Sequence, residues 1–177
     1  NAQVLRIDRS ELALPLITKA LSHEHFDRLS IVAHGSPGSI QLGRVPITAS
    51  LLRESSADLQ TWSSSFIDLY SCFVGLDADF IDTFSEITSS CVASSDSLVG
   101  HSDLGGSWIL KGFNNIVPFS SCARAAWKVS LANIFFDNVN GDDNNDGTAS
   151  NKAVATVSKL LTLGSAGSGS DLSGDDV

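Results

Sequence analysis

Short apolar runs alternate along much of the chain with segments whose apolar residues recur at helical spacing. Runs bounded by turn residues are typical of buried strands, and the wider spacing is typical of amphipathic helices. Strands are predicted at residues 4–8, 29–33, 66–70, 90–94 and 105–110, with a hairpin arm at 39–43. Helices are predicted at 12–21, 47–52, 56–62 and 77–88, with Ser10 and Thr48 as caps.

This alternation of strands and helices predicts the fold class. Successive strands separated by helices favour a mostly parallel sheet. We therefore expect an α/β domain built as a three-layer αβα sandwich, with helices on both faces of the sheet. In such open sheets, ligands bind at the carboxyl ends of the strands.

Two of the predicted strands end close to a reactive side chain. His34 follows the run 29–33, and Cys72 follows the run 66–70. Parallel strands place their carboxyl ends at the same edge, so His34 and Cys72 could face one another, as a thiol nucleophile and its base require. The alternative is that His34 packs a turn and that Cys72 is an ordinary buried thiol.

Overall composition limits the classes of partner. The net charge is −9, hydrophobic residues make up 42% of the chain and charged residues 18%. This balance predicts a folded core and excludes nucleic acid or an anionic membrane as main partner, because both select basic surfaces. No run reaches the roughly 18 apolar residues of a membrane span, so no membrane insertion is expected. The chain starts at Asn1 and has no Met, which suggests a processed or excised piece.

The cysteines leave two arrangements open. There are three of them, at positions 72, 91 and 122. In a secreted protein an odd count leaves one thiol unpaired. Either Cys91 and Cys122 form a disulfide and Cys72 stays free, or all three are buried thiols.

The character of the sequence changes near residue 131. Asp142, Asn144 and Asp146 match the first half of a calcium-binding loop. The Glu that would complete an EF-hand is replaced by Ala153, so a full EF-hand is excluded. A looser structural calcium site or a solvated turn remains, and no other cofactor is expected to be required. The tail from Gly164 is rich in Gly and Ser, as in linkers.

Four segments resemble a known family. The run IVAHGSPGSIQLG at 31–43, together with 69–72, 92–96 and 105–110, is similar in order and spacing to the DUF4347 domains. The resemblance implies a domain near the N-terminus of a very large secreted or cell-surface protein. It also implies His-Gly and Cys strand ends like those of the caspase, gingipain and separase clan of cysteine peptidases. Ala33, Ser71 and Phe73 depart from the residues usual in the family.

A second resemblance concerns the C-terminal part. Residues 133–161 are similar to the opening segment of right-handed parallel β-helices, whose stacked coils need more chain than is present here. We therefore expect a caspase-like domain at 1–130. Residues 131–177 are expected to be a linker and the β-rich beginning of a β-helix module in a truncated chain.

With this resemblance the strand ends acquire expected roles. Cys72 is the nucleophile and His34 its base, and the oxyanion is bound by the N–H groups of Gly35 and Cys72. Ser95 and Asp96 follow the run 90–94 and are expected to line the substrate pocket, where an acidic Asp96 favours a basic side chain. An alkylating probe is then expected to label Cys72 before the other two cysteines.

Two functions follow as hypotheses. The first is a secreted or surface-bound cysteine-peptidase-like domain, self-processing through His34 and Cys72. The second is a non-catalytic structural or assembly module of an extracellular filament, adhesin or surface layer. The expected partners are the parent polypeptide in the first case and neighbouring protein subunits in the second.

Overall fold

Three of the predicted apolar runs form one parallel sheet. The computed structural model describes residues 3–112, 117–131, 139–145, 155–156 and 158. In it, β1 (Arg28–Val32), β5 (Phe66–Tyr70) and β6 (Cys91–Ser94) pair in the order β1-β5-β6. Val32 lies opposite Tyr70, and Leu69 lies opposite Ser94. The carboxyl ends of the three strands therefore meet at one edge, as predicted.

A small antiparallel sheet continues directly from β1. It consists of β2 (His34–Ser36), β3 (Ser39–Gln41) and β4 (Ile47–Thr48), in the order β2-β3-β4. The turn between β2 and β3 contains Gly38 at φ +69°, a left-handed conformation that glycine adopts at no steric cost. The predicted hairpin arm is thus confirmed, and it carries His34 on its first strand.

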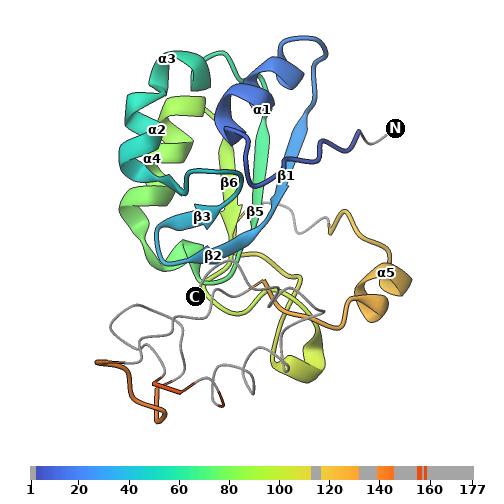
Figure 1. The fold of residues 1–177 in the computed structure, drawn as a ribbon. Helices are drawn as coiled ribbons and strands as arrows, with labels where there is room; N and C mark the ends of the chain where they lie inside the picture. The colour runs from blue at the N-terminus through green and yellow to red at the C-terminus, as the bar shows by residue number, and fades with distance from the viewer. Residues whose placement is uncertain (1–2, 113–116, 132–138, 146–154, 157, 159–177) are drawn as a thin grey trace.

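Four helices pack against one face of the parallel sheet (Figure 1). They are α1 (Ala13–Leu21), α2 (Ala49–Glu54), α3 (Ser56–Leu59) and α4 (Ala78–Thr88). Thr48 caps α2 as predicted, its hydroxyl accepting from Leu51 N–H at 3.3 Å. The four helices bury their apolar stripes on the side chains of this face, which are Leu29, Ile31, Ile67, Leu69 and Val92.

The other face of the sheet is chemically different. Arg28 makes two hydrogen bonds to the Asp68 carboxylate, at 2.6 and 2.8 Å, and Ser30 adds a third at 3.1 Å. A charged network of this kind offers a helix no continuous apolar surface to pack on. Towards the carboxyl end, Tyr70 is covered by Trp108 and by Phe119. Among the described residues, helices therefore cover one face of the sheet, and loops with α5 (Ser121–Ala126) lie near the strand ends.

Three local predictions were wrong. Residues 4–8 form no strand: Val4 is 93% exposed, so this run has no partner to pair with. The N-cap of α1 is Leu12, without a side-chain hydrogen bond, and not Ser10. Residues 106–110 form no strand, and Lys111 alone makes an isolated bridge to Ser94.

The predicted C-terminal β-rich segment falls largely on residues 132–138, 146–154, 157 and 159–177, which lie outside the described residues. In the part of the chain that the structure describes, no helix is long and apolar enough to cross a membrane.

Candidate functional site

The loops after β1 and β5 touch one another at the backbone. A Cβ atom built on Gly35 would lie 2.7 Å from Ser71 Cβ and 3.2 Å from Cys72 N. Real Cβ atoms do not come so close to their neighbours, so only glycine fits between the two strand ends. The His34–Gly35 and Ser71–Cys72 segments are therefore in direct contact, although 37 positions separate Gly35 from Cys72 in the sequence.

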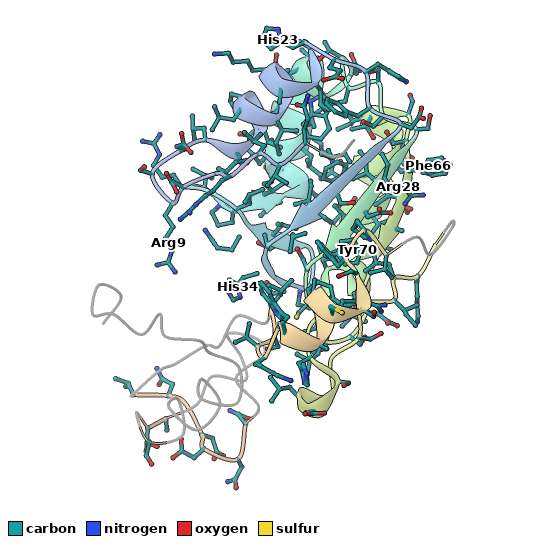
Figure 2. The ribbon with its side chains drawn as sticks, turned by 90° about the vertical axis from the view of Figure 1, so that its right-hand side faces the viewer. Arg9, His23, Arg28, His34, Phe66 and Tyr70 are labelled. Atoms are coloured by element: carbon teal, nitrogen blue, oxygen red, sulfur yellow. The ribbon has the colours of Figure 1, made fainter. Side chains whose placement is uncertain are left out.

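His34 and Cys72 differ sharply in exposure. His34 is exposed at the start of β2, opposite Gln41 of β3. Figure 2 shows its ring at the margin of the folded domain. Cys72, by contrast, is 0% exposed. The structure thus places a solvated imidazole on one strand end and a buried thiol just past the next.

The Cys72 thiol is held in its protonated form. Its Sγ accepts a hydrogen bond from Val99 N–H at 3.1 Å and lies 3.6 Å from Val99 O. Burial raises the pKa of Cys72 to about 11, and the backbone hydrogen bonds of Val99 and Leu131 offset this only in part. This is the opposite of the lowered pKa that activates a thiol. In the structure as it stands, Cys91 and Cys122 are the more accessible thiols.

The residue after Cys72 adopts a rare backbone conformation. Phe73 has φ 59° and ψ 2°, the left-handed region that asparagine and glycine tolerate best. Its N–H donates to Ser97 O at 3.1 Å and its carbonyl accepts from Leu76 N–H at 3.0 Å. These bonds hold the turn despite a cost of about 1–2 kcal/mol. The turn fixes the direction in which the chain leaves Cys72.

A segment far along the chain lies across the strand ends. Residues 129–131, which we call the strap, pair in antiparallel fashion with residues 99–101. Leu131 N–H donates to Val99 O at 2.8 Å, and His101 N–H donates to Val129 O at 3.1 Å. Gly35 N–H donates to Leu131 O at 3.1 Å. The N–H group predicted to bind an oxyanion therefore already binds a carbonyl of the same chain.

The strap buries its last side chain beside the thiol. Leu131 is 5% exposed and belongs to the same apolar cluster as Cys72. The remaining buried members of this cluster are Tyr70, Ala93, Val99, Trp108 and Leu110. The strap was not predicted from the sequence. Its alternating Val129-Ser130-Leu131 pattern was the one local signal of a strand.

The two residues expected to line the substrate pocket lie at the same edge. Ser95 is buried, and its hydroxyl donates to Ser97 O at 3.0 Å. The Asp96 carboxylate is paired with the Lys111 ammonium group. That hydrogen bond holds the pKa of Asp96 below its usual range. The negative charge expected to attract a basic substrate is thus already paired within the chain.

Neither predicted arrangement of the cysteines is present: Cys91 and Cys122 form no disulfide, and they are not buried. Cys91 and Cys122 are both free and exposed. Cys91 pairs with Phe66 at the beginning of the sheet. Figure 2 shows Phe66 and Tyr70 at opposite ends of β5, with the helix that carries Cys122 near the Tyr70 end. A disulfide needs Cα atoms within about 7 Å of one another, and the length of the strand lies between these two cysteines.

The Asp/Asn-rich segment forms a turn where it is described. The Asp142 carboxylate accepts hydrogen bonds from Asn144 N–H and from the Asn144 side-chain amide, both at 2.8 Å. Asp146, the third predicted calcium ligand, lies outside the described residues. Within the described ranges, no group of three or more acidic, His or Cys side chains is arranged to hold a metal ion.

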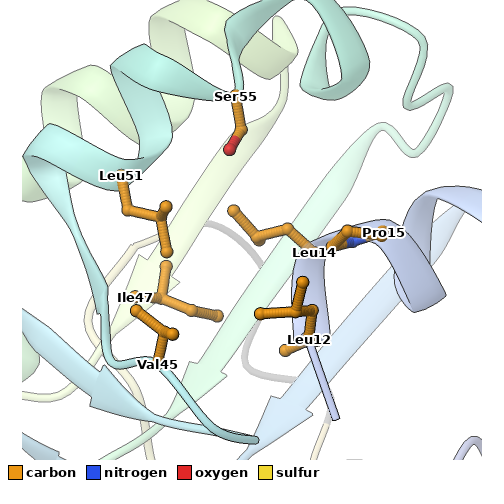
Figure 3. Close-up of a pocket in the computed structure, with 8 residues that line it drawn as sticks. Leu12, Leu14, Pro15, Val45, Ile47, Leu51 and Ser55 are labelled. Atoms are coloured by element: carbon orange, nitrogen blue, oxygen red, sulfur yellow. The ribbon is translucent and has the colours of Figure 1, made fainter.

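A separate apolar pocket lies between α1 and α2 (Figure 3). Its volume is about 150 Å³. Seven of the eight lining residues are apolar, and Ser55 is the exception: Leu12, Ala13, Leu14, Pro15, Val45, Ile47, Leu51 and Ser55. With no titratable side chain in its lining, this pocket offers no acid, base or thiol chemistry. The strand ends near His34 and Cys72 remain the site with reactive groups.

The fold and the strand ends define an α/β domain with a His-Gly turn after one parallel strand and a Cys turn after the next. Comparison with known families gives the class a name: residues 1–131 match the model of the domain of unknown function DUF4347, and the chain belongs to that family. The matched region ends at Leu131, the last residue of the strap. No curated protein and no solved structure matches the chain.

Proposed function

We propose that this domain is a cysteine-peptidase-like module of a large secreted or cell-surface protein, and that it acts on its own polypeptide through His34 and Cys72. The single observation that carries the proposal is the hydrogen bond from Gly35 N–H to Leu131 O at 3.1 Å. A peptidase binds the carbonyl of its substrate to backbone donors beside the nucleophile. Here the carbonyl of Leu131, in the same chain, accepts the hydrogen bond from Gly35 N–H, and the Leu131 side chain packs in one cluster with Cys72.

Each group is assigned one role in the proposed reaction. His34 accepts the thiol proton, and the thiolate attacks the carbonyl. Gly35 N–H and Cys72 N–H then bind the oxyanion. These two residues are in backbone contact, since a Cβ on Gly35 would lie 3.2 Å from Cys72 N. A burial-raised thiol pKa of about 11 means that proton transfer to His34 must accompany attack.

A non-catalytic structural module is the second candidate, and one observation favours it. The Cys72 thiol is buried and bonded to the Val99 backbone, as expected of a sulfur that only fills a core. In this alternative, the strap is a permanent part of the fold. The domain would then join subunits of a filament, adhesin or surface layer without cutting them.

Fragmentation of the chain distinguishes the two candidates. The purified chain is incubated with a reductant at neutral pH, and intact masses are followed over time. We expect the wild-type chain to be cut at one peptide bond, whichever it is, and Cys72→Ala and His34→Ala to stay intact. His23→Ala is the matched control, because His23 is exposed and lies far from His34, at the other end of the domain (Figure 2). An intact wild-type chain, or equal fragmentation in Cys72→Ala, would refute the peptidase proposal and leave the structural module.

A further inference from the structure

We infer that the bond cleaved is the one that follows Leu131, and that the apolar cluster around Cys72 selects an apolar side chain of about leucine size at this position. The inference rests on the proposed function and names its substrate. Two features of the structure support it: the hydrogen bond that holds the Leu131 carbonyl, and the apolar residues that surround the Leu131 side chain.

The backbone of the strap is held as a peptidase cleft holds an extended peptide. Alternate residues of the strap exchange hydrogen bonds with residues 99–101: Leu131 N–H with Val99 O, and Val129 O with His101 N–H. Such strand addition aligns a peptide by its main chain and leaves specificity to side-chain pockets. At the centre, Gly100 has φ +143° and lies so close to Val129 and Ser130 that a side chain there would clash. This pairing fixes which carbonyl reaches the donor.

That carbonyl belongs to Leu131. It accepts the Gly35 N–H at 3.1 Å, beside the Cys72 backbone. Leu131 also contributes a backbone hydrogen bond that acts on the Cys72 thiol. Both its amide and its carbonyl therefore lie at the strand ends, whereas Val129 is bonded farther away, at His101. Register alone thus singles out the carbonyl of Leu131 among the strap residues.

The surroundings of the Leu131 side chain set the selectivity. It is buried in a cluster of Tyr70, Ala93, Val99, Trp108 and Leu110, which offers no charge to a substrate. The nearby acidic group, Asp96, is paired with Lys111. A basic or acidic side chain placed among these apolar residues would lose its hydration. The pocket is therefore expected to prefer an apolar side chain, in place of the basic one predicted from Asp96 alone.

The reaction balances with water as the only co-reactant. The Cys72 proton moves to His34, and Sγ bonds to the carbonyl carbon of Leu131. The bond from that carbon to the nitrogen of the next residue breaks, and this nitrogen takes the proton from His34. Water then adds to the thioester: its hydroxyl stays on Leu131 as the new carboxyl group, and its second proton returns to the Cys72 sulfur.

The position of the cut tests the inference. The 177-residue chain is incubated as above, and each fragment is identified by intact mass and by sequencing of its new N-terminus. We expect fragments 1–131 and 132–177 in wild type and in Leu131→Met. Leu131→Asp and Leu131→Lys are expected to react at least about 10-fold more slowly, since an apolar pocket rejects a charge. Ile109→Asp is the matched control, because this neighbour of Trp108 is 61% exposed.

The outcomes separate this inference from the proposed function. A Cys72-dependent cut at another bond would overturn the inference and leave the self-processing function standing. Absence of any Cys72-dependent cut would overturn both. Equal rates in Leu131→Lys and Leu131→Met would overturn the selectivity even if the cut falls after Leu131. The position of the cut is determined directly in the wild-type chain. The test of the cleavage site therefore stays valid if a charged variant fails to fold.

Discussion

The strap makes a sharp prediction about the reactivity of Cys72. Removing the Leu131 side chain by Leu131→Ser should release the strap from its cluster and expose the thiol. Truncating a buried leucine typically costs about 2–5 kcal/mol, enough to open a three-residue segment held by a few backbone bonds. We therefore expect Cys72 to change from the slowest-labelled thiol of the chain to one comparable with Cys91 and Cys122.

The magnitude follows from the thiol pKa. Burial raises the pKa of Cys72 from 9.0 to about 11. At pH 8 the thiolate fraction is then about 0.001, compared with about 0.1 for a thiol of pKa 9.0, since each pKa unit is a tenfold change. Only the thiolate reacts with an alkylating reagent. Release of the strap should therefore speed the labelling of Cys72 up to about 100-fold, before any gain in steric access.

Iodoacetamide labelling with peptide mass spectrometry measures the three thiols separately. Samples quenched over time at pH 8 give one rate for each cysteine, and Cys91 serves as the internal reference. The matched control is Leu110→Ser, because Leu110 is equally buried in the same cluster but makes no bond to Gly35. We expect Leu131→Ser to speed Cys72 well beyond the control.

Two results would refute this reasoning. If Cys72 of the wild type is labelled as fast as Cys91, the thiol is not sealed by the strap. If Leu110→Ser and Leu131→Ser speed Cys72 equally, exposure reflects general loosening of the cluster and not release of a particular segment.

Three further predictions concern stability. Because folding raises the pKa of Cys72, the contribution of its thiol to the free energy of unfolding is complete below pH 9 and is lost as the pH rises towards 11. In urea unfolding, wild type should therefore lose about 2 kcal/mol more stability than Cys72→Ala between pH 8 and 10.5. Equal losses would contradict a thiol that is buried in its protonated form. Phe73 has a left-handed backbone, so Phe73→Gly should be more stable than Phe73→Ala by about 1 kcal/mol. Elsewhere in a fold the alanine variant is usually the more stable one. A more stable Phe73→Ala would therefore disprove the strained turn. Arg28→Met should lower the free energy of unfolding by about 3 kcal/mol, because it leaves Asp68 buried without its partner. Adding Asp68→Leu should restore part of this loss. If thermal unfolding shows that the two substitutions lower stability additively, the ion pair does not contribute as proposed.

The sequence by itself determined the parallel core and which residues lie at its edge. β1, β5 and β6 were predicted because each is a short apolar run with turn residues behind it, and α1 and α4 because their apolar residues recur at helical spacing. The contact between the His34 and Cys72 turns followed from the parallel order of these strands. Thr48 was recognisable as a cap from its position alone. These are local signals, carried by residues within one or two turns of chain.

Only the tertiary structure decided whether those reactive groups are open. The bond from Gly35 to Leu131 joins residues 96 positions apart, and no local pattern encodes such a pairing. The strand predicted at 4–8 failed for the same reason, because alternation describes a strand but does not supply the neighbour that it must pair with. Burial of Cys72, which sets the pKa of its thiol, is likewise a property of the assembled cluster and of no single segment.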